Sequence, residues 1–422
     1  MNYFTIPTNP SINELINWFQ IEFTPLANAM KASNHNTVPD EPNPYHLEDQ
    51  VWAHTCMVAL RAEILDVPKI NKICAILHDI GKPIAREVID FEAKKPVHSD
   101  SNQIRNDGKN DGKPSGLQRV MPKSGKKCHF RGHEGLSFYL AIEPLLNLKS
   151  LGVLDDKEVQ TCLQVISMHG SLFDNIDADG NMKKESKVFD KFLAKDVDVF
   201  NHFILQVKCD SLGRFFMSKD GRKNNAERLC TEIFTAEQFL SYHREKAVRT
   251  ALTASHQPWI EVLIGVPGSG KSTYLKDKVY TPESAPIIIS RDDTLMEFAK
   301  ANNVPGNYSE VWNKLTPEDQ KIVDQVLENK FKKAFNDREN IIVDMTNMSN
   351  KAQRKWTNKV NAPKIYRAKA TVFVTSYDEV YRRLKKREQE TGKAIPDFVV
   401  KNMMKGFMVP NYSVFEDIKY IF

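Results

Sequence analysis

The stretch Gly265-Val266-Pro267-Gly268-Ser269-Gly270-Lys271-Ser272 decides how the second part of this chain folds. It fits the pattern G-x-x-x-x-G-K-[ST], in which the backbone N–H groups of a glycine-rich loop surround nucleotide phosphates. The apolar run 260–264 precedes the loop and predicts a buried strand, and a helix-compatible segment follows over 272–278. A strand, a loop and a helix N-terminus in this order form an anion-binding site. The stretch therefore predicts binding of a nucleoside triphosphate.

The side chains of the loop have separate expected roles. We expect Lys271 to reach the β- and γ-phosphates of ATP, and the Ser272 hydroxyl to coordinate Mg²⁺. ATP and Mg²⁺ are thus the expected cofactors of this part of the chain. The residues expected to bind them are Gly265, Pro267, Gly268, Ser269, Gly270, Lys271, Ser272 and Thr273.

Three further apolar runs after the loop predict a parallel sheet that alternates with helices. The runs cover 285–290, 340–344 and 370–374, and a helical segment follows over 377–387. Open α/β sheets bind ligands at the carboxyl ends of their strands. The polar residues at these ends are therefore expected to face the phosphates and the substrate; they are Arg291, Asp292, Asp293, Asp344, Thr346 and Asn347.

Transfer of a phosphoryl group needs a positioned base and positive charge on the transferring group. Asp292 is the expected base for the attacking hydroxyl, and Asp344 is expected to hold Mg²⁺ through water or to orient the acceptor. Arg383 and Arg387 lie four residues apart, on one face of the predicted helix, and would neutralise the transferring group. The alternative for this arginine pair is a solvated basic helix face, because other cations surround it.

Residues 258–422 resemble the kinase domain of phage-type polynucleotide 5′-kinases. The motifs that carry the resemblance are Gly265-x4-Gly270-Lys271-Ser272-Thr273, Ser290-Arg291-Asp292-Asp293, Val343-Asp344-Met345-Thr346-Asn347, Arg383-x3-Arg387 and Gly392-Lys393-Ala394-Ile395-Pro396. The resemblance implies that Asp292 is the general base for a nucleic-acid 5′-hydroxyl. The family arginine that contacts the acceptor phosphate is replaced here by Leu295. Arg291, or a basic residue near Arg354 and Lys355, is the candidate substitute.

The first part of the chain contains a second set of residues with ligand chemistry. His78-Asp79 ends an apolar helical segment, and the two side chains are suited to hold a metal ion together. His54, His133, His169 and Asp210 also lie on or beside apolar helical segments, where an unpaired polar group is costly. A single histidine in such a place is usually structural, but the whole set indicates a metal site.

The order H…HD…H…H…D resembles the HD-domain phosphohydrolase superfamily, over about residues 40–245. The resemblance implies that His54, His78, Asp79 and Asp210 coordinate one divalent transition metal ion. His133 and His169 would complete a second site, with Asp79 as the bridge. Mixed imidazole and carboxylate ligands suit Mn²⁺, Fe, Co²⁺, Ni²⁺ or Zn²⁺ better than Mg²⁺ alone. We expect Lys82 to bind the scissile phosphate, with an ordinary surface lysine as the alternative.

Hydrophobic periodicity divides the chain into two domains. Helical patterns at 11–30, 48–61, 70–78, 135–146, 156–168, 187–193, 197–212 and 224–246 predict an all-helical HD-type domain over 1–248. A linker is expected at 249–257, and an α/β P-loop domain with a parallel sheet at 258–422. The segment 92–128 is rich in glycine and in basic residues, and predicts an insertion that is either a solvated loop or a contact to a phosphate backbone.

The composition and the N-terminal sequence predict the cellular compartment of the protein. The 422 residues carry a net charge of +5 and six cysteines with no C-x-x-C pair, which predicts free thiols in a reducing compartment. The N-terminus has no basic segment followed by an apolar core, and no apolar run approaches the roughly 18 residues of a membrane span. We therefore expect a cytoplasmic protein with no membrane partner.

The two parts together resemble bacterial and phage fusions of an HD phosphohydrolase with a polynucleotide kinase, which heal nucleic-acid ends. The resemblance implies transfer of the γ-phosphate of ATP to a 5′-hydroxyl, and removal of 2′,3′-cyclic or 2′/3′-phosphate ends. RNA or DNA ends would be the substrates, and a nucleic-acid ligase would act downstream. Two alternatives stay open: a small-molecule P-loop kinase fused to an HD nucleotide phosphohydrolase, and a non-enzymatic, nucleotide-gated RNA-binding protein.

Overall fold

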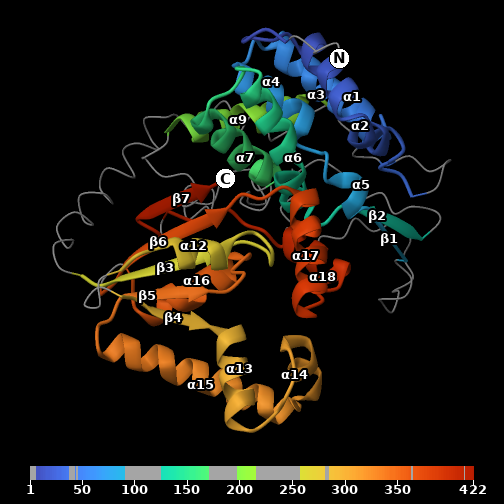
Figure 1. The fold of residues 1–422 in the computed structure, drawn as a ribbon. Coiled ribbons are helices and arrows are strands. Elements are labelled where there is room, and N and C mark those ends of the chain that lie inside the picture. Colours follow the sequence, from blue (N-terminus) through green and yellow to red (C-terminus); the bar gives the residue numbers. More distant parts are fainter. Residues whose placement is uncertain are drawn as a thin grey trace, which may run out of the picture. The chain divides into compact units, whose positions relative to one another are not determined.

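The computed structural model of the protein describes residues 6–37, 43, 46–90, 125–170, 197–214, 257–280, 285–362, 365–412 and 414–422. The chain divides into two compact units, Met1–Arg244 and Glu245–Phe422. The first is mainly helical and the second is an α/β domain with a parallel sheet, as the sequence predicts (Figure 1). The predicted helices at 187–193 and 224–246, most of the insertion and nearly all of the linker lie outside the described residues.

The first unit is built from helices with apolar inner faces. They are α1 (Ile12–Glu22), α2 (Thr24–Lys31), α3 (Val51–Ile64), α4 (Lys69–Leu77), α5 (Lys82–Ala85), α6 (His133–Ser150), α7 (Asp156–Met168) and α9 (Val197–Leu212). The amino ends of α1 and α7 are fixed by capping boxes, Ser11 with Glu14 and Asp155 with Glu158. The buried Trp18 donates a hydrogen bond of 2.9 Å to Asn147, which joins α1 to α6.

One prediction for this unit is wrong, because it is not entirely helical. Strand β1 (Glu87–Asp90) pairs antiparallel with β2 (Lys126–His129). The end of the predicted 92–128 insertion is therefore a strand, whereas 91–124 lies outside the described residues. Apolar and polar side chains do not alternate in 87–90 (EVID) or in 126–129 (KKCH), so periodicity does not reveal these strands. The pairing partners are also separated by the whole insertion.

The second unit contains a five-stranded sheet in the order β4-β5-β3-β6-β7, in which every neighbouring pair is parallel. The strands are β3 (Trp259–Ile264), β4 (Ile287–Ser290), β5 (Ile341–Asp344), β6 (Arg367–Phe373) and β7 (Asp417–Ile421). The first four occupy the predicted runs, and β7 is an addition. Parallel pairing requires crossover connections, which here contain helices and bring the carboxyl ends of the strands to one edge.

The helices of this unit are α12 (Lys271–Asp277), α13 (Arg291–Ala301), α14 (Tyr308–Lys314), α15 (Pro317–Asn336), α16 (Asn350–Lys359), α17 (Tyr377–Thr391) and α18 (Asp397–Lys405). In Figure 1, α13, α14 and α15 lie beside one another, next to β4. The side chains between these helices form a small apolar core that contains Leu295, Ala299, Val311 and Val323.

A buried carboxylate stabilises the central strand. Glu261 of β3 accepts hydrogen bonds from Tyr274 (2.6 Å), Thr371 (2.7 Å) and Lys278 (2.9 Å). Burial alone raises the pKa of Glu261, but these three donors lower it overall below its usual value. The carboxylate therefore stabilises the fold above its unfolded pKa, and this contribution is lost as the pH falls through the lower, folded pKa.

We expect Glu261→Gln to lower the free energy of unfolding at pH 7 by about 1–3 kcal/mol, because a charged acceptor of three hydrogen bonds is lost. Urea unfolding of the full chain would measure the change. The variant should also lose less stability than the wild type on acidification below about pH 4.5, the ordinary glutamate value. Glu297→Gln, on an exposed side chain of α13, is the control. Equal stabilities of both variants would contradict the role of Glu261.

Within the described ranges, no helix combines the length and the apolar character that crossing a membrane requires. The described cysteines Cys56, Cys74, Cys128, Cys162 and Cys209 are free thiols.

Candidate functional site

The glycine-rich loop connects β3 to α12 at the carboxyl edge of the sheet. Gly268 and Gly270 have positive φ angles of 82° and 102°, which glycine adopts without the strain that a Cβ atom would cause. A Cβ on Gly265 would lie 2.5 Å from the Ser269 hydroxyl oxygen, so this position also needs glycine. Ser272 and Thr273 are exposed in the first turn of α12. The loop therefore has the conformation that phosphate binding requires.

Lys271 folds back over the loop. Its Nζ donates hydrogen bonds to the carbonyl oxygens of Gly265 (2.7 Å) and Val266 (2.9 Å). Burial lowers the pKa of Lys271 to about 8, although the carboxylates of Asp344 and Asp292 oppose this shift. An anionic phosphate at the loop would favour the charged form of the lysine. The ammonium group is thus held at the loop by two backbone carbonyls.

The polar residues after β5 shape the loop rather than projecting freely. The backbone N–H of Gly265 donates to the carbonyl of Thr346 (3.1 Å), and the buried Asn347 amide donates to the carbonyl of Leu263 (2.9 Å). Asn347 has a positive φ of 45°, which asparagine tolerates better than most residues. The backbone carbonyl of Thr346 and the side chain of Asn347 therefore hold the end of β3, and their expected contact with a substrate stays a prediction.

Asp292 has two partners in the structure. Tyr308 donates its phenolic hydrogen to one carboxylate oxygen (2.8 Å), and the Lys393 ammonium lies 2.5 Å from the other. Partial burial raises the pKa of Asp292, but Lys393 and Tyr308 lower it overall, so the group is a carboxylate at neutral pH. By contrast, burial and the nearby Asp293 and Asp292 raise the pKa of Asp344. Asp292 is thus the better oriented of the two acids.

The predicted lid arginines lie on α17, beside the loop. Arg383 is held by Glu379 (2.6 Å) and approaches the carbonyl oxygen of Gly268 at 3.4 Å. Arg387 is half-buried. Its positive charge makes a small contribution that lowers the pKa of both Lys271 and Asp292. The pair therefore faces the phosphate loop, whereas Arg382 is exposed and forms an ion pair with Glu379.

Leu295 is fully buried in the apolar core between α13, α14 and α15. The side chain at this position therefore stabilises the packing of α13 and does not face a substrate. The candidate substitute Arg291 is already engaged, because it donates to Asp324 (2.8 Å) and to Gln320 (2.7 Å) on α15. Lys393 is the cation that reaches Asp292. The sequence motif contained Lys393, but gave no reason to place it there.

The six predicted metal ligands of the first unit come together from five parts of the chain. His54 lies on α3, His78 and Asp79 follow α4, and His133 begins α6; His169 ends α7, and Asp210 lies on α9. Their ligand atoms form two groups, in each of which all atoms lie within 4.8 Å of one another. One group contains His54, His78 and Asp210, and the other contains Asp79, His133 and His169. All but His133 are buried.

Asp79 lies between the two groups. Its Oδ1 is 3.3 Å from His133 Nε2 and 3.5 Å from His169 Nε2. Its Oδ2 is 3.2 Å from His78 Nε2 and 3.5 Å from His54 Nε2. Burial alone raises the pKa of Asp79, but His78, Lys82 and the other imidazoles hold it well below its usual value. The geometry is that of a carboxylate able to bridge two cations.

Three imidazoles of the cluster are oriented in the same way. The Nδ1 atoms of His78, His133 and His169 lie 3.0, 2.8 and 2.7 Å from the backbone carbonyl three residues earlier. A carbonyl oxygen only accepts, so each Nδ1 carries a hydrogen and each neutral ring has a free lone pair on Nε2. Such bonds to the second ring nitrogen are typical of metal-ligating histidines.

With these free lone pairs the cluster could hold cations. His133 Nε2 and His169 Nε2 lie 3.1 Å apart, which is unfavourable between two neutral rings unless a proton or a metal ion lies between them. The buried His78 Nε2 and both oxygens of Asp79 have no partner with hydrogen-bond geometry among the described residues. Burial lowers the pKa of His169, but Asp79 raises it overall. The donor set fits a divalent transition metal.

Two glycines allow the helices to approach this site. A Cβ on Gly81 would lie 2.4 Å from the carbonyl oxygen of His133 and 2.6 Å from the backbone nitrogen of Ser137. Gly132 caps the amino end of α6 with a positive φ of 72°. Glycine at both positions therefore lets the turn after α4 pack directly on α6, which brings Asp79 to His133.

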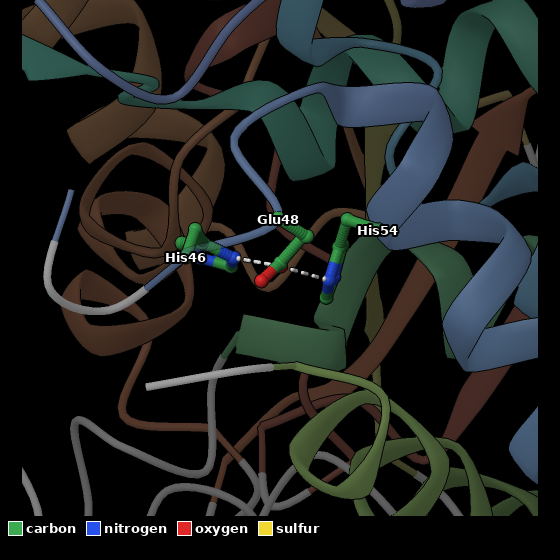
Figure 2. Close-up of side chains that lie close together, drawn as sticks. All are labelled: His46, Glu48 and His54. Carbon is green, nitrogen blue, oxygen red and sulfur yellow. Dashed lines mark hydrogen bonds and ion pairs between the residues drawn. The ribbon is translucent and has the colours of Figure 1, made fainter. Parts of the chain in front are cut away.

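The structure adds residues that sequence reasoning missed. Glu48 lies 2.9 Å from Nδ1 of both His46 and His54, and Figure 2 shows its carboxylate between the two rings. His35 stacks on His46, with 4.0 Å between ring centroids, and its Nε2 is 3.0 Å from Lys82 Nζ. No motif in the sequence distinguishes these residues, because their contacts depend on the loop before α3.

Lys82 is buried, so the surface-lysine alternative is wrong. Its Nζ lies 2.7 Å from Asp79 Oδ2, and His35 can only accept at Nε2, because its Nδ1 faces the Asp49 carbonyl oxygen at 2.6 Å. Lys82 is therefore fixed at the edge of the cluster by Asp79 and His35.

Comparison with known proteins identifies the type of domain that the second unit contains. Residues 260–410 match the family described as AAA domain, so this part is a P-loop kinase-like domain, as predicted; such a domain implies ATP and Mg²⁺ binding. A chain of the solved structure of the Pnkp1/Rnl/Hen1 RNA repair complex is 23% identical, with a TM-score of 0.30. That match covers 37% of this chain and 49% of the other, so the protein spans about half of its relative.

Proposed function

We propose that the protein is a bifunctional enzyme that prepares nucleic-acid ends for sealing. The P-loop domain would transfer the γ-phosphate of ATP to a polynucleotide 5′-hydroxyl. The helical domain, of HD type, would remove a 2′,3′-cyclic phosphate or a 2′- or 3′-phosphate. The observation that supports the proposal most is that one chain contains both a phosphate loop facing a paired carboxylate and a buried carboxylate surrounded by four imidazoles.

In the proposed kinase site the residues act by position and charge. Lys271 and the loop N–H groups bind the triphosphate, and Arg383 and Arg387 neutralise the transferring group. Asp292 accepts the proton of the attacking hydroxyl, since Tyr308 and Lys393 leave lone pairs free on its oxygens. The Ser272 hydroxyl would hold Mg²⁺, and Asp293 and Asp344 would orient the metal shell or the acceptor.

In the proposed hydrolase site, His54, His78 and Asp210 would hold one divalent ion and His133 and His169 a second, with Asp79 shared. Such ions act as Lewis acids on a phosphate ester and make water nucleophilic at neutral pH. Lys82 supplies a fixed positive charge for a phosphate oxygen, because Asp79 and His35 hold its ammonium group in place. Glu48 orients the His54 ring through Nδ1.

Metal analysis and an end-healing assay test the proposal together. We expect the purified full chain to bind Mn²⁺, Co²⁺, Ni²⁺ or Zn²⁺ in a ratio of one or two per chain, measured by mass spectrometry of the metal content. A chelator should abolish release of phosphate from a cyclic-phosphate RNA end, and the transition metal should restore it. Transfer from ATP to a 5′-hydroxyl oligonucleotide should need only Mg²⁺.

The outcomes also separate the alternatives. Transfer to a nucleoside or sugar but not to an oligonucleotide would support a small-molecule kinase, which the loss of the acceptor arginine at Leu295 favours. Failure to bind any transition metal, together with no transfer, would support a nucleotide-gated RNA-binding protein. RNA and DNA oligonucleotides of the same sequence would establish the preferred nucleic acid, and addition of a ligase would test the downstream step.

A further inference from the structure

An aromatic pair lies close to Asp292. One of its side chains is exposed and has no role in the proposed phosphoryl transfer. Tyr308 and Trp312 lie one turn apart on α14, with ring centroids 6.1 Å apart and planes inclined by 22°. Tyr308 packs against the apolar core of α13, α14 and α15, and Val311 is the buried residue of the helix. Trp312 is 43% exposed. A large, flat side chain is therefore presented to solvent beside Tyr308, the residue that bonds to Asp292.

The indole of Trp312 is held rather than loose. The Arg291 guanidinium lies 5.1 Å from the centre of its ring, and Arg291 is itself fixed by Asp324 and Gln320. Lys393 Nζ lies 3.3 Å from the centre of the Tyr308 ring while it pairs with Asp292. Cations stacked on aromatic faces are attracted by the ring electrons and order the side chains. The surface is thus flat and rigid, and each of its cations is paired with a carboxylate, Arg291 with Asp324 and Lys393 with Asp292.

We propose that Trp312, supported by Arg291 and Tyr308, stacks on the base of the nucleotide that carries the 5′-hydroxyl. This inference rests on the proposed kinase function and names how it recognises its acceptor. Tyr308 bonds directly to Asp292, so the platform begins at the group that would accept the hydroxyl proton. In a nucleotide the base and the 5′-oxygen lie on the same face of the sugar, so a base can reach α14 while its 5′-hydroxyl lies at Asp292, which Tyr308 of α14 contacts.

Stacking also suits an enzyme that acts on ends of any sequence. Every base has a flat π face, so an aromatic platform binds single strands with little sequence preference. Arg291 and Lys393, which lie over the two rings, are each paired with a carboxylate, so this platform would bind through its ring face rather than through free charge. This contact would supply acceptor affinity that the buried Leu295 does not provide.

The test compares two acceptors of equal length, one with a normal 5′-terminal base and one with an abasic 5′-terminal nucleotide. With wild-type protein and saturating ATP and Mg²⁺, we expect KM to be about 5- to 150-fold higher for the abasic acceptor. Trp312→Ala should raise KM for the normal acceptor to a similar extent, with little change in kcat. Trp312→Tyr should restore most of the affinity.

Controls separate this role from folding and from ATP binding. Phe422→Ala, at another exposed aromatic side chain of the same unit, should leave both acceptors unchanged. KM for ATP should not move in Trp312→Ala. Equal KM values for both acceptors in the wild type, or an effect of Trp312→Ala on ATP alone, would overturn the inference and leave the kinase function intact. Absence of transfer to any oligonucleotide would overturn the proposed function, and this inference with it.

Discussion

Replacing Asp79 with alanine is expected to abolish hydrolysis of cyclic-phosphate ends and to leave transfer of phosphate from ATP unchanged. The side chain contacts four imidazoles and Lys82, so its loss removes the shared negative charge from both groups of ligands. Changes in the second shell of a metal site already cost about 10- to 100-fold in affinity. We therefore expect metal affinity to fall by at least about 100-fold, measured by titration with Mn²⁺ or Zn²⁺.

The substitution also leaves the buried Lys82 without its carboxylate, which costs about 3–5 kcal/mol in comparable buried pairs. Thermal unfolding of the variant, and its kinase activity as an internal standard, distinguish a lost site from a lost fold. Asp156→Ala, at an exposed carboxylate on α7, is the matched control and should keep both activities. Hydrolysis that survives in Asp79→Ala would show that the reaction does not depend on the cluster.

The mirror experiment is Lys271→Ala, which is expected to lower kcat/KM for phosphoryl transfer by at least about 10²- to 10³-fold. The ammonium group lies at the loop, where it donates to the carbonyl oxygens of Gly265 and Val266, so its charge is close to the expected positions of the β- and γ-phosphates. Hydrolysis and metal content should match the wild type. Lys276→Ala, on an exposed side chain of the same helix, is the control. Loss of both activities would instead indicate one composite site.

The same lysine gives a pH dependence with a definite sign. Burial lowers the pKa of Lys271 to about 8, and bound phosphates would favour the protonated form. ATP affinity is therefore expected to be constant below pH 8 and to fall as the pH rises above it, because binding then requires uptake of a proton. Titration of ATP binding between pH 7 and 10 by calorimetry would show this, and Lys271→Ala should remove the dependence.

Much of the second unit was predictable because its information is local. The loop from Gly265 to Ser272, the apolar runs and the acids that follow them are consecutive residues, and parallel pairing brings their ends to one edge whatever the strand order. The strand β7 was missed, since its residues, Asp417 to Ile421, alternate with charges and resemble a polar terminus. The pairing of Lys393 with Asp292 was also missed, because about a hundred residues separate the partners.

In the helical unit, the ligand residues could be predicted from the sequence, but their contacts could not. The histidines and aspartates were recognised as a set, but nothing in the sequence reveals which nitrogen of each ring is free. That depends on backbone carbonyls three residues earlier and on the Glu48 carboxylate. His35 joins the site only because its loop packs on Lys82. The ribbon β1–β2 escaped prediction for the same reason, since its strands meet across the insertion.

A phosphate-binding loop, a parallel sheet around it and a separate helical part rich in histidine and aspartate could all be predicted from the order of the residues. Motifs and periodicity are properties of neighbouring residues, so they can be read without coordinates. The folded chain was needed to show that Asp79 lies between four imidazoles, that Leu295 belongs to a core, and that Asp292 is bonded to Lys393 and Tyr308. These contacts join distant parts of the chain, and packing alone sets the distances between them.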